Sequence, residues 1–197
     1  MDFDASLIGE KEWEWAEHSV HKIIGEPDKV IKIPHKGPRL FWADADQIKA
    51  DITTTKAYFP GMTLETEVNG EGKNKKYHII QQRLPEGARE LIPSDLLKES
   101  VRLKFEELLS MNQNLIDETG SSLELLWKSW WIWLMLWAPK LWNVFITKEW
   151  KLILPDTTLM QIEKNRYHRF CYEFWRALIQ EHFLNEKGVW YDTSATT

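Results

Sequence analysis

Twelve of the 197 residues are tryptophan, and several of them stand where the neighbouring sequence favours glycine. Residues 143–154 have the pattern of two short strands joined by the turn Lys148-Glu149-Trp150. The residue before the second strand of such a hairpin adopts a positive φ, which glycine reaches without strain and bulky residues rarely reach. A chain that forms this hairpin must hold Trp150 in a left-handed conformation, and we predict that conformation.

The segment Glu12-Trp-Glu-Trp-Ala16 shows the same anomaly, because Gly-Glu-Gly-Ala would form a loop of the phosphate-binding type. We hypothesise that several tryptophans are encoded by UGA in an organism that reads UGA as glycine. The positions concerned are Trp13, Trp15, Trp137, Trp142 and Trp150. The alternative is a protein that is natively rich in tryptophan. The codon behind each tryptophan separates the two.

The composition otherwise describes an ordinary globular chain. Charged residues make up 28% of it and the net charge is −5, so there is no general attraction for nucleic acid. The single cysteine, Cys171, excludes an internal disulfide and suits a reducing compartment. The first residues contain neither a basic region nor a long apolar run, so we expect no signal peptide and a cytoplasmic location.

The first part of the chain alternates short strands with turns and contains one helix. Strands are predicted at residues 7–8, 19–24, 29–33, 63–68 and 76–84, and the helix at residues 43–58. The predicted order is therefore three strands, a helix and two strands. Pro85-Glu-Gly87 marks a change to a second part that is mainly helical.

In the second part, Ser94 is predicted to be the N-cap of a long helix that stops at Gly120. The hairpin of residues 143–154 follows, and a last helix is predicted from about Met160 to Leu184.

This layout resembles the protein-kinase-like fold, an α+β fold with two lobes. The resemblance implies a first lobe at residues 1–84, with a five-stranded antiparallel sheet and one helix, and a hinge at residues 85–93. An abbreviated, mainly helical second lobe would span residues 94–191, followed by a disordered tail at 192–197.

Local motifs carry the resemblance in the first lobe. Trp13, Trp15, His18 and Val20 have the spacing of Gly-x-Gly-x-x-Gly-x-Val, whose glycines let backbone amides approach nucleotide phosphates. The tripeptide that ends at Lys32, Val-Ile-Lys, resembles Val-Ala-Ile-Lys, so Lys32 is implied to contact the phosphates.

The resemblance also implies partners for Lys32 and for the nucleotide base. The acid that pairs with Lys32 would lie on the predicted helix, where Asp51 has about the right spacing, with Asp44 and Asp46 as rivals. Ile80 and Gln82, near the hinge, are implied to contact the nucleotide.

In the second lobe, Asn143 resembles the catalytic-loop asparagine and Asp156 the aspartate of Asp-Phe-Gly. An amide oxygen and a carboxylate suit magnesium, so the implied cofactors are ATP and Mg²⁺. Lys140 stands three residues before Asn143, as a lysine does in many kinase catalytic loops. The catalytic aspartate would be at residue 138, which is alanine, and no His-Arg-Asp motif is present.

These departures indicate a degenerate kinase-like protein that binds an adenine nucleotide or has a regulatory role. The resemblance leaves a protein partner open and implies no nucleic-acid partner. The first alternative is an active atypical phosphotransferase for a protein or small molecule, similar to small bacterial kinase-like proteins. The second is a non-enzymatic membrane-interface protein that uses the tryptophan-rich residues 127–137. That segment is too short to span a bilayer, so we do not expect a membrane protein.

Simpler interpretations exist for each site residue. Lys32 suits a solvated position in an alternating strand, Asp156 suits the N-cap of a following helix, and Asn143 suits a turn.

Overall fold

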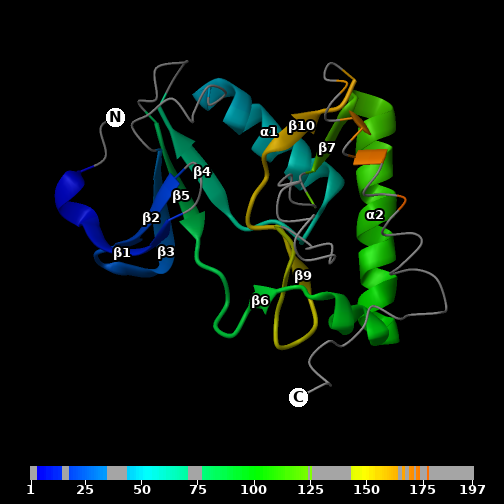
Figure 1. The fold of residues 1–197 in the computed structure, drawn as a ribbon. Helices are drawn as coiled ribbons and strands as arrows, with labels where there is room; N and C mark the ends of the chain where they lie inside the picture. The colour runs from blue at the N-terminus through cyan, green and yellow to red at the C-terminus, as the bar shows by residue number, and fades with distance from the viewer. Residues whose placement is uncertain are drawn as a thin grey trace, which may run out of the picture. The chain divides into compact units, whose positions relative to one another are not determined.

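The computed structural model describes residues 4–14, 18–34, 44–70, 77–123, 125 and 143–163, with helical positions at 166, 169, 170, 172, 173 and 177 (Figure 1). The protein is α+β, with a five-stranded antiparallel sheet and two α-helices whose bounds are described. The chain divides into two compact units. Unit 1 comprises Met1–Ala57 and Thr63–Pro85, and unit 2 comprises Tyr58–Met62 and Glu86–Thr197.

Unit 1 contains the five-stranded sheet (Figure 1). A 3-10 turn at Ala5–Leu7 precedes the strands β1 (Ile8–Glu14), β2 (His18–Ile23), β3 (Glu26–Pro34), β4 (Thr66–Asn69) and β5 (His78–Gln82). They lie in the order β1-β2-β3-β5-β4 with antiparallel pairing throughout. One helix stands between β3 and β4, so the predicted order of three strands, a helix and two strands is confirmed.

One row of paired residues crosses the whole sheet. Trp13 pairs with Val20, Val20 with Lys32, Lys32 with Ile79, and Ile79 with Val68. Directly paired residues of antiparallel strands project from the same face, so these five side chains share one face of the sheet. We call it the Lys32 face.

The helix α1 (Ala45–Tyr58) packs on the Lys32 face. Asp44 caps it, because its Oδ1 accepts a hydrogen bond from the backbone N–H of Asp46 at 3.0 Å. The buried residues of α1 recur at helical spacing: Ala45, Asp51, Ile52 and Thr55. The apolar cluster between helix and sheet consists of Ala45, Ile52, Val68, Tyr77 and Ile79, with Ile48 at its margin.

Unit 2 is built on the long helix α2 (Glu99–Thr119). A stripe of buried residues runs along it: Val101, Phe105, Leu108, Asn112 and Leu115. Gly120 follows with a φ of 67°, so the predicted stop is confirmed. A side chain there would also be obstructed, since a Cβ on Gly120 would lie 2.7 Å from the side chain of Glu163.

The start of α2 differs from the prediction that Ser94 is its N-cap. Residues Pro93–Leu97 form a separate 3-10 turn, η2, and Lys98 occupies the N-cap position of α2. The carboxylate of Asp95 explains the separate turn. It accepts two hydrogen bonds of 2.6 Å from Arg89 and one of 3.0 Å from the backbone N–H of Ile92.

Short strands complete unit 2. β6 (Arg89–Glu90), β8 (Phe145–Ile146) and β9 (Leu152–Ile153) form a three-stranded sheet in the order β6-β8-β9, and β7 (Ser121–Leu123) pairs with β10 (Leu159–Gln161). The predicted hairpin of residues 143–154 is confirmed by β8 and β9. The helix predicted from Met160 is wrong at its start, because pairing with β7 makes residues 159–161 a strand.

The hairpin turn contains the predicted left-handed tryptophan. Trp150 has a φ of 61°. Its N–H donates to the Thr147 carbonyl at 3.0 Å, and the Thr147 N–H donates to the Lys151 carbonyl at 3.0 Å. This is a tight turn followed by a one-residue bulge, the arrangement that usually places glycine at the bulge. The Trp150 ring lies against the ammonium of Lys98, 3.7 Å from the ring centroid.

Replacing Trp150 should reveal the cost of its backbone conformation. We expect Trp150→Gly to be more stable than Trp150→Ala by about 1 kcal/mol, because both variants lose the ring but only alanine keeps a Cβ at positive φ. Urea denaturation of the two variants measures the difference. Equal stability would show that the left-handed turn is not strained.

The Asp95 carboxylate should stabilise unit 2 in a pH-dependent way. Burial raises the pKa of Asp95, but the hydrogen bonds from Arg89 and Ile92 and the guanidinium charge outweigh burial and hold the pKa below its ordinary value. The stabilisation is therefore complete above the unfolded-state pKa, about 4, and is lost as the pH falls through the lower folded-state pKa.

We expect the free energy of unfolding of the unmodified chain to exceed that of Asp95→Asn at pH 6. The excess should shrink steadily below pH 4. Urea denaturation at a series of pH values tests this, and an excess that does not change with pH would contradict it.

Candidate functional site

Lys32 lies at the centre of the five-stranded sheet and is removed from solvent. It is on β3, between Val20 on β2 and Ile79 on β5, and only 6% of it is exposed. The interpretation of Lys32 as a solvated lysine is therefore wrong. A buried ammonium group needs a compensating negative charge, from the protein or from a ligand.

The acidic residues of α1 have different surroundings. Asp44 caps the helix, and Asp46 is exposed, with its Oδ1 4.0 Å from Lys49 Nζ. Asp51 is 6% exposed, on the helix side that packs against the Lys32 face. Its Oδ1 accepts a hydrogen bond of 2.7 Å from Gln47 Nε2. An acid that pairs with the buried Lys32 must itself be buried. Of the three acids, only Asp51 is.

The loop motif lies partly on β1. Trp13 ends the row that contains Val20 and Lys32, whereas Trp15 lies outside the described residues. The indole N–H of Trp13 is buried and has no hydrogen-bond partner in the described part of the chain. Buried tryptophan N–H groups usually find a partner, and glycine at residue 13 would leave no such group.

The two predicted hinge contacts do not join Lys32. Ile80 pairs with Ile31, and Gln82 pairs with Lys29, so both side chains project from the face opposite the Lys32 face. Ile79 is the β5 residue that pairs with Lys32.

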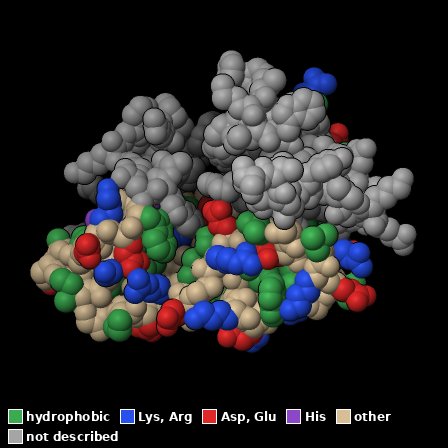
Figure 2. Space-filling view, turned by 60° about the horizontal axis from the view of Figure 1, so that its bottom comes forward, with side chains coloured by type: hydrophobic (Ala, Val, Ile, Leu, Met, Phe, Trp, Pro, Cys, Tyr) green, Lys and Arg blue, Asp and Glu red, His purple; other side chains and the backbone are tan. Residues whose placement is uncertain are grey.

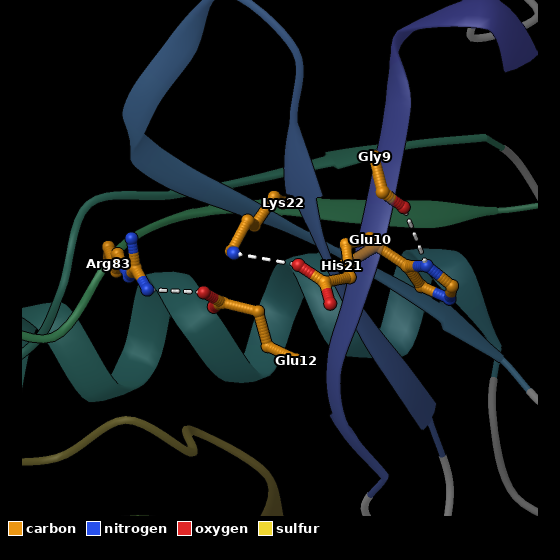
Figure 3. Close-up of polar contacts among 6 residues, drawn as sticks. All are labelled: Gly9, Glu10, Glu12, His21, Lys22 and Arg83. Atoms are coloured by element: carbon orange, nitrogen blue, oxygen red, sulfur yellow. Dashed lines mark hydrogen bonds and ion pairs between the residues drawn. The ribbon is translucent and has the colours of Figure 1, made fainter.

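An ion pair beside this region, between a buried carboxylate and a partly exposed arginine, was not predicted from the sequence. The Glu12 side chain on β1 is only 6% exposed, and its Oε1 accepts a hydrogen bond from Arg83 Nη2, directly after β5 (Figure 3). The neighbouring pair of Glu10 and Lys22 has an N–O distance of 3.1 Å and is far more exposed. The pairing of β1 with β2 shifts by one residue between Lys11 and Trp13, and this bulge changes the direction in which the Glu12 side chain projects. Sequence patterns do not reveal such bulges.

In unit 2, the hairpin brings Asn143 and Asp156 to the same end. Phe145 pairs with Ile153 and Ile146 with Leu152. Asn143 stands two residues before Phe145 and Asp156 three residues after Ile153, so both belong to the end of the hairpin away from its turn. Asn143 has a φ of 58°, a conformation that asparagine tolerates better than most residues.

The surroundings of Asp156 exclude one of its two interpretations, the N-cap of a following helix. Both described hydrogen bonds of its carboxylate go to Oδ1, from the Thr158 N–H at 3.0 Å and the Thr158 hydroxyl at 2.8 Å. The next element is the strand β10, so Asp156 does not cap a helix. A carboxylate oxygen and an amide oxygen are both ligand types that Mg²⁺ accepts.

The strand β7, which leads into residues 124–142, is fixed to α2 by a buried polar network. The Asn112 Oδ1 accepts a hydrogen bond of 2.9 Å from the Leu123 N–H, and its Nδ2 donates to the Ser122 hydroxyl at 3.0 Å. Lys140 and Ala138 belong to the segment after β7 and lie outside the described residues, as does the whole tryptophan-rich stretch of residues 127–137.

One face of the described surface carries charges of both signs. On the face shown in Figure 2, basic and acidic side chains are interspersed over the described residues. No helix in the described ranges is long and apolar enough to cross a membrane. Within the same ranges, no group of three or more His, Cys, Asp or Glu side chains could hold a metal ion by itself. Two protein ligands are enough for magnesium when a nucleotide supplies phosphate oxygens.

Comparison with known proteins adds no relative to this description: no protein-family model matches the sequence, and no curated protein sequence matches it at a significant level.

Proposed function

We propose that this chain is a degenerate kinase-like protein that binds an adenine nucleotide together with Mg²⁺. Lys32 neutralises the phosphates, Asp51 holds the Lys32 ammonium in position, and Asn143 and Asp156 provide oxygen ligands for the metal ion. The loop that contains residues 13 and 15 covers the phosphates, in a form with glycine at both positions.

The observation that carries this proposal is the burial of Lys32. A lysine that served only solubility would expose its ammonium group, whereas Lys32 is 6% exposed in the middle of a sheet. The same face of the sheet is covered by α1, which contributes the buried Asp51. Such a lysine is suited to neutralise the charge of a phosphate group.

The proposed binding of Mg²⁺ is based on the side-chain oxygens of two residues at the end of the hairpin. Asp156 and Asn143 offer one carboxylate and one amide oxygen, a ligand set that magnesium accepts when phosphate oxygens and water complete its coordination. The bound ion would neutralise phosphate charge.

The proposed lack of efficient transfer rests on residue 138. Alanine there provides no group to orient a hydroxyl or to take its proton. General-base catalysis is typically worth about 10²–10⁴-fold in rate. Transfer is therefore expected to be slow or absent even when the nucleotide is bound.

Lys32→Ala should abolish binding of Mg·ATP, measured by calorimetry on the full chain with glycine at residues 13 and 15. The matched control is Lys29→Ala. It removes a lysine of the same strand that is exposed and forms an ion pair with Glu26. We expect the control to bind like the parent. If both variants bind equally well, Lys32 has no role in the site, and if the parent does not bind at millimolar ATP, the proposal fails.

Asp156→Ala should weaken ATP binding in the presence of Mg²⁺ but have little effect in excess EDTA, because Asp156 acts through the metal ion. The matched control is Asp117→Ala, which removes an exposed carboxylate from α2. Turnover of ATP by the parent should stay close to background. Brisk phosphate transfer would instead favour the active phosphotransferase.

A further inference from the structure

The strongest unexplained feature outside the Lys32 and Asp156 sites is the carboxylate of Glu12. Its side chain is 6% exposed, and one oxygen accepts the hydrogen bond from Arg83. The other oxygen, Oε2, is buried without a hydrogen-bond partner among the described residues. A buried acceptor left without a donor costs about 1–3 kcal/mol, so a donor at this place would be stabilising.

The position of this carboxylate connects it with the proposed nucleotide site. Glu12 directly precedes Trp13, which ends the row of residues that contains Lys32. Arg83 follows β5, where its N–H donates to the Asp28 carbonyl at 2.7 Å. In the sheet, β2 and β3 stand between β1 and β5. The ion pair of Glu12 and Arg83 therefore joins a residue of β1 to the end of a strand that is not its neighbour (Figure 3).

The two side chains together offer complementary hydrogen-bonding groups. Glu12 Oε2 is an acceptor, and the Arg83 guanidinium has five N–H donors on a side chain that is 42% exposed. They match a nucleobase edge on which an exocyclic amine stands beside an unprotonated ring nitrogen. The amine can donate to Glu12, and the ring nitrogen can accept from Arg83. Two oxygens of one carboxylate would be needed for the adjacent N–H groups of guanine, but Oε1 is already bound to Arg83.

We propose that Glu12 and Arg83 recognise the adenine base: Glu12 Oε2 accepts a hydrogen bond from the exocyclic amine, and Arg83 donates to a neighbouring ring nitrogen. This inference rests on the proposed nucleotide site and adds its base specificity. Lys32 then acts on the phosphates and Glu12 on the base, from two strands of the same sheet.

The experiment compares three ligands by calorimetry on the full chain with glycine at residues 13 and 15. They are ATP, purine riboside triphosphate, which lacks only the exocyclic amine, and tripolyphosphate, which lacks the nucleoside. We expect removal of the amine to weaken binding about 10- to 100-fold, the range for a hydrogen bond to a charged acceptor. GTP should bind more weakly than ATP.

The variant Glu12→Gln should lose this discrimination. It should bind ATP and purine riboside triphosphate equally, and tripolyphosphate as the parent does. The matched control is Glu10→Gln, on the same strand but in the exposed pair with Lys22. It should keep the parent's preference for ATP. Because the amine is also removed on the ligand side, the test does not depend on the folding of the Glu12 variant.

The outcomes distinguish this inference from the proposed function. If ATP and tripolyphosphate bind but the amine contributes nothing, or Glu12→Gln keeps the preference for ATP, the Glu12 inference is overturned and the proposed function stands. Tighter binding of GTP also overturns the inference. If neither ATP nor tripolyphosphate binds, both fail together.

Discussion

The burial of a lysine in the central strand of a sheet is the constraint on which the first unit depends. An ammonium group that leaves water is tolerated only where negative charge compensates it. Lys32 is buried because β2 and β5 flank its strand and α1 covers the face from which it projects. Asp44 fixes the first residue of α1, and Asp51 stands seven residues later, about two helical turns, on the side that packs against the sheet.

Local sequence signals predicted much of the fold. The alternation of strands and turns gave the order of elements around Lys32, and Gly120 gave the end of α2. The turn at Trp150 was predicted from the geometry that a tight hairpin imposes on a single residue. Each of these features depends on interactions between residues that are close in sequence, where propensities and turn chemistry act directly.

Features set by distant pairing could not be predicted in the same way. Met160 belongs to a strand because β10 pairs with β7, almost 40 residues earlier in the chain, although its local sequence continues a helical pattern. Ile80 and Gln82 project away from Lys32 because of the pairing register of β5, in which Ile79 is the residue that pairs with Lys32. The burial of the Glu12 side chain depends on a bulge in β1. Ser94 is not the N-cap of α2, because Asp95 binds Arg89 and holds the residues around Ser94 in a separate turn.

Two tryptophans conflict with the structure for two unrelated physical reasons. Trp150 has a backbone conformation that disfavours any Cβ, whereas Trp13 has a buried indole N–H without a described partner. Glycine removes both conflicts, since it has neither a Cβ nor an indole. Residue 13 also matters for the proposed site, because it directly follows Glu12 and ends the row of residues that contains Lys32. An indole there occupies space on the Lys32 face, and glycine would leave that space to the proposed ligand. The same replacement that relieves the buried N–H therefore opens the face on which Lys32 and Glu12 are proposed to act.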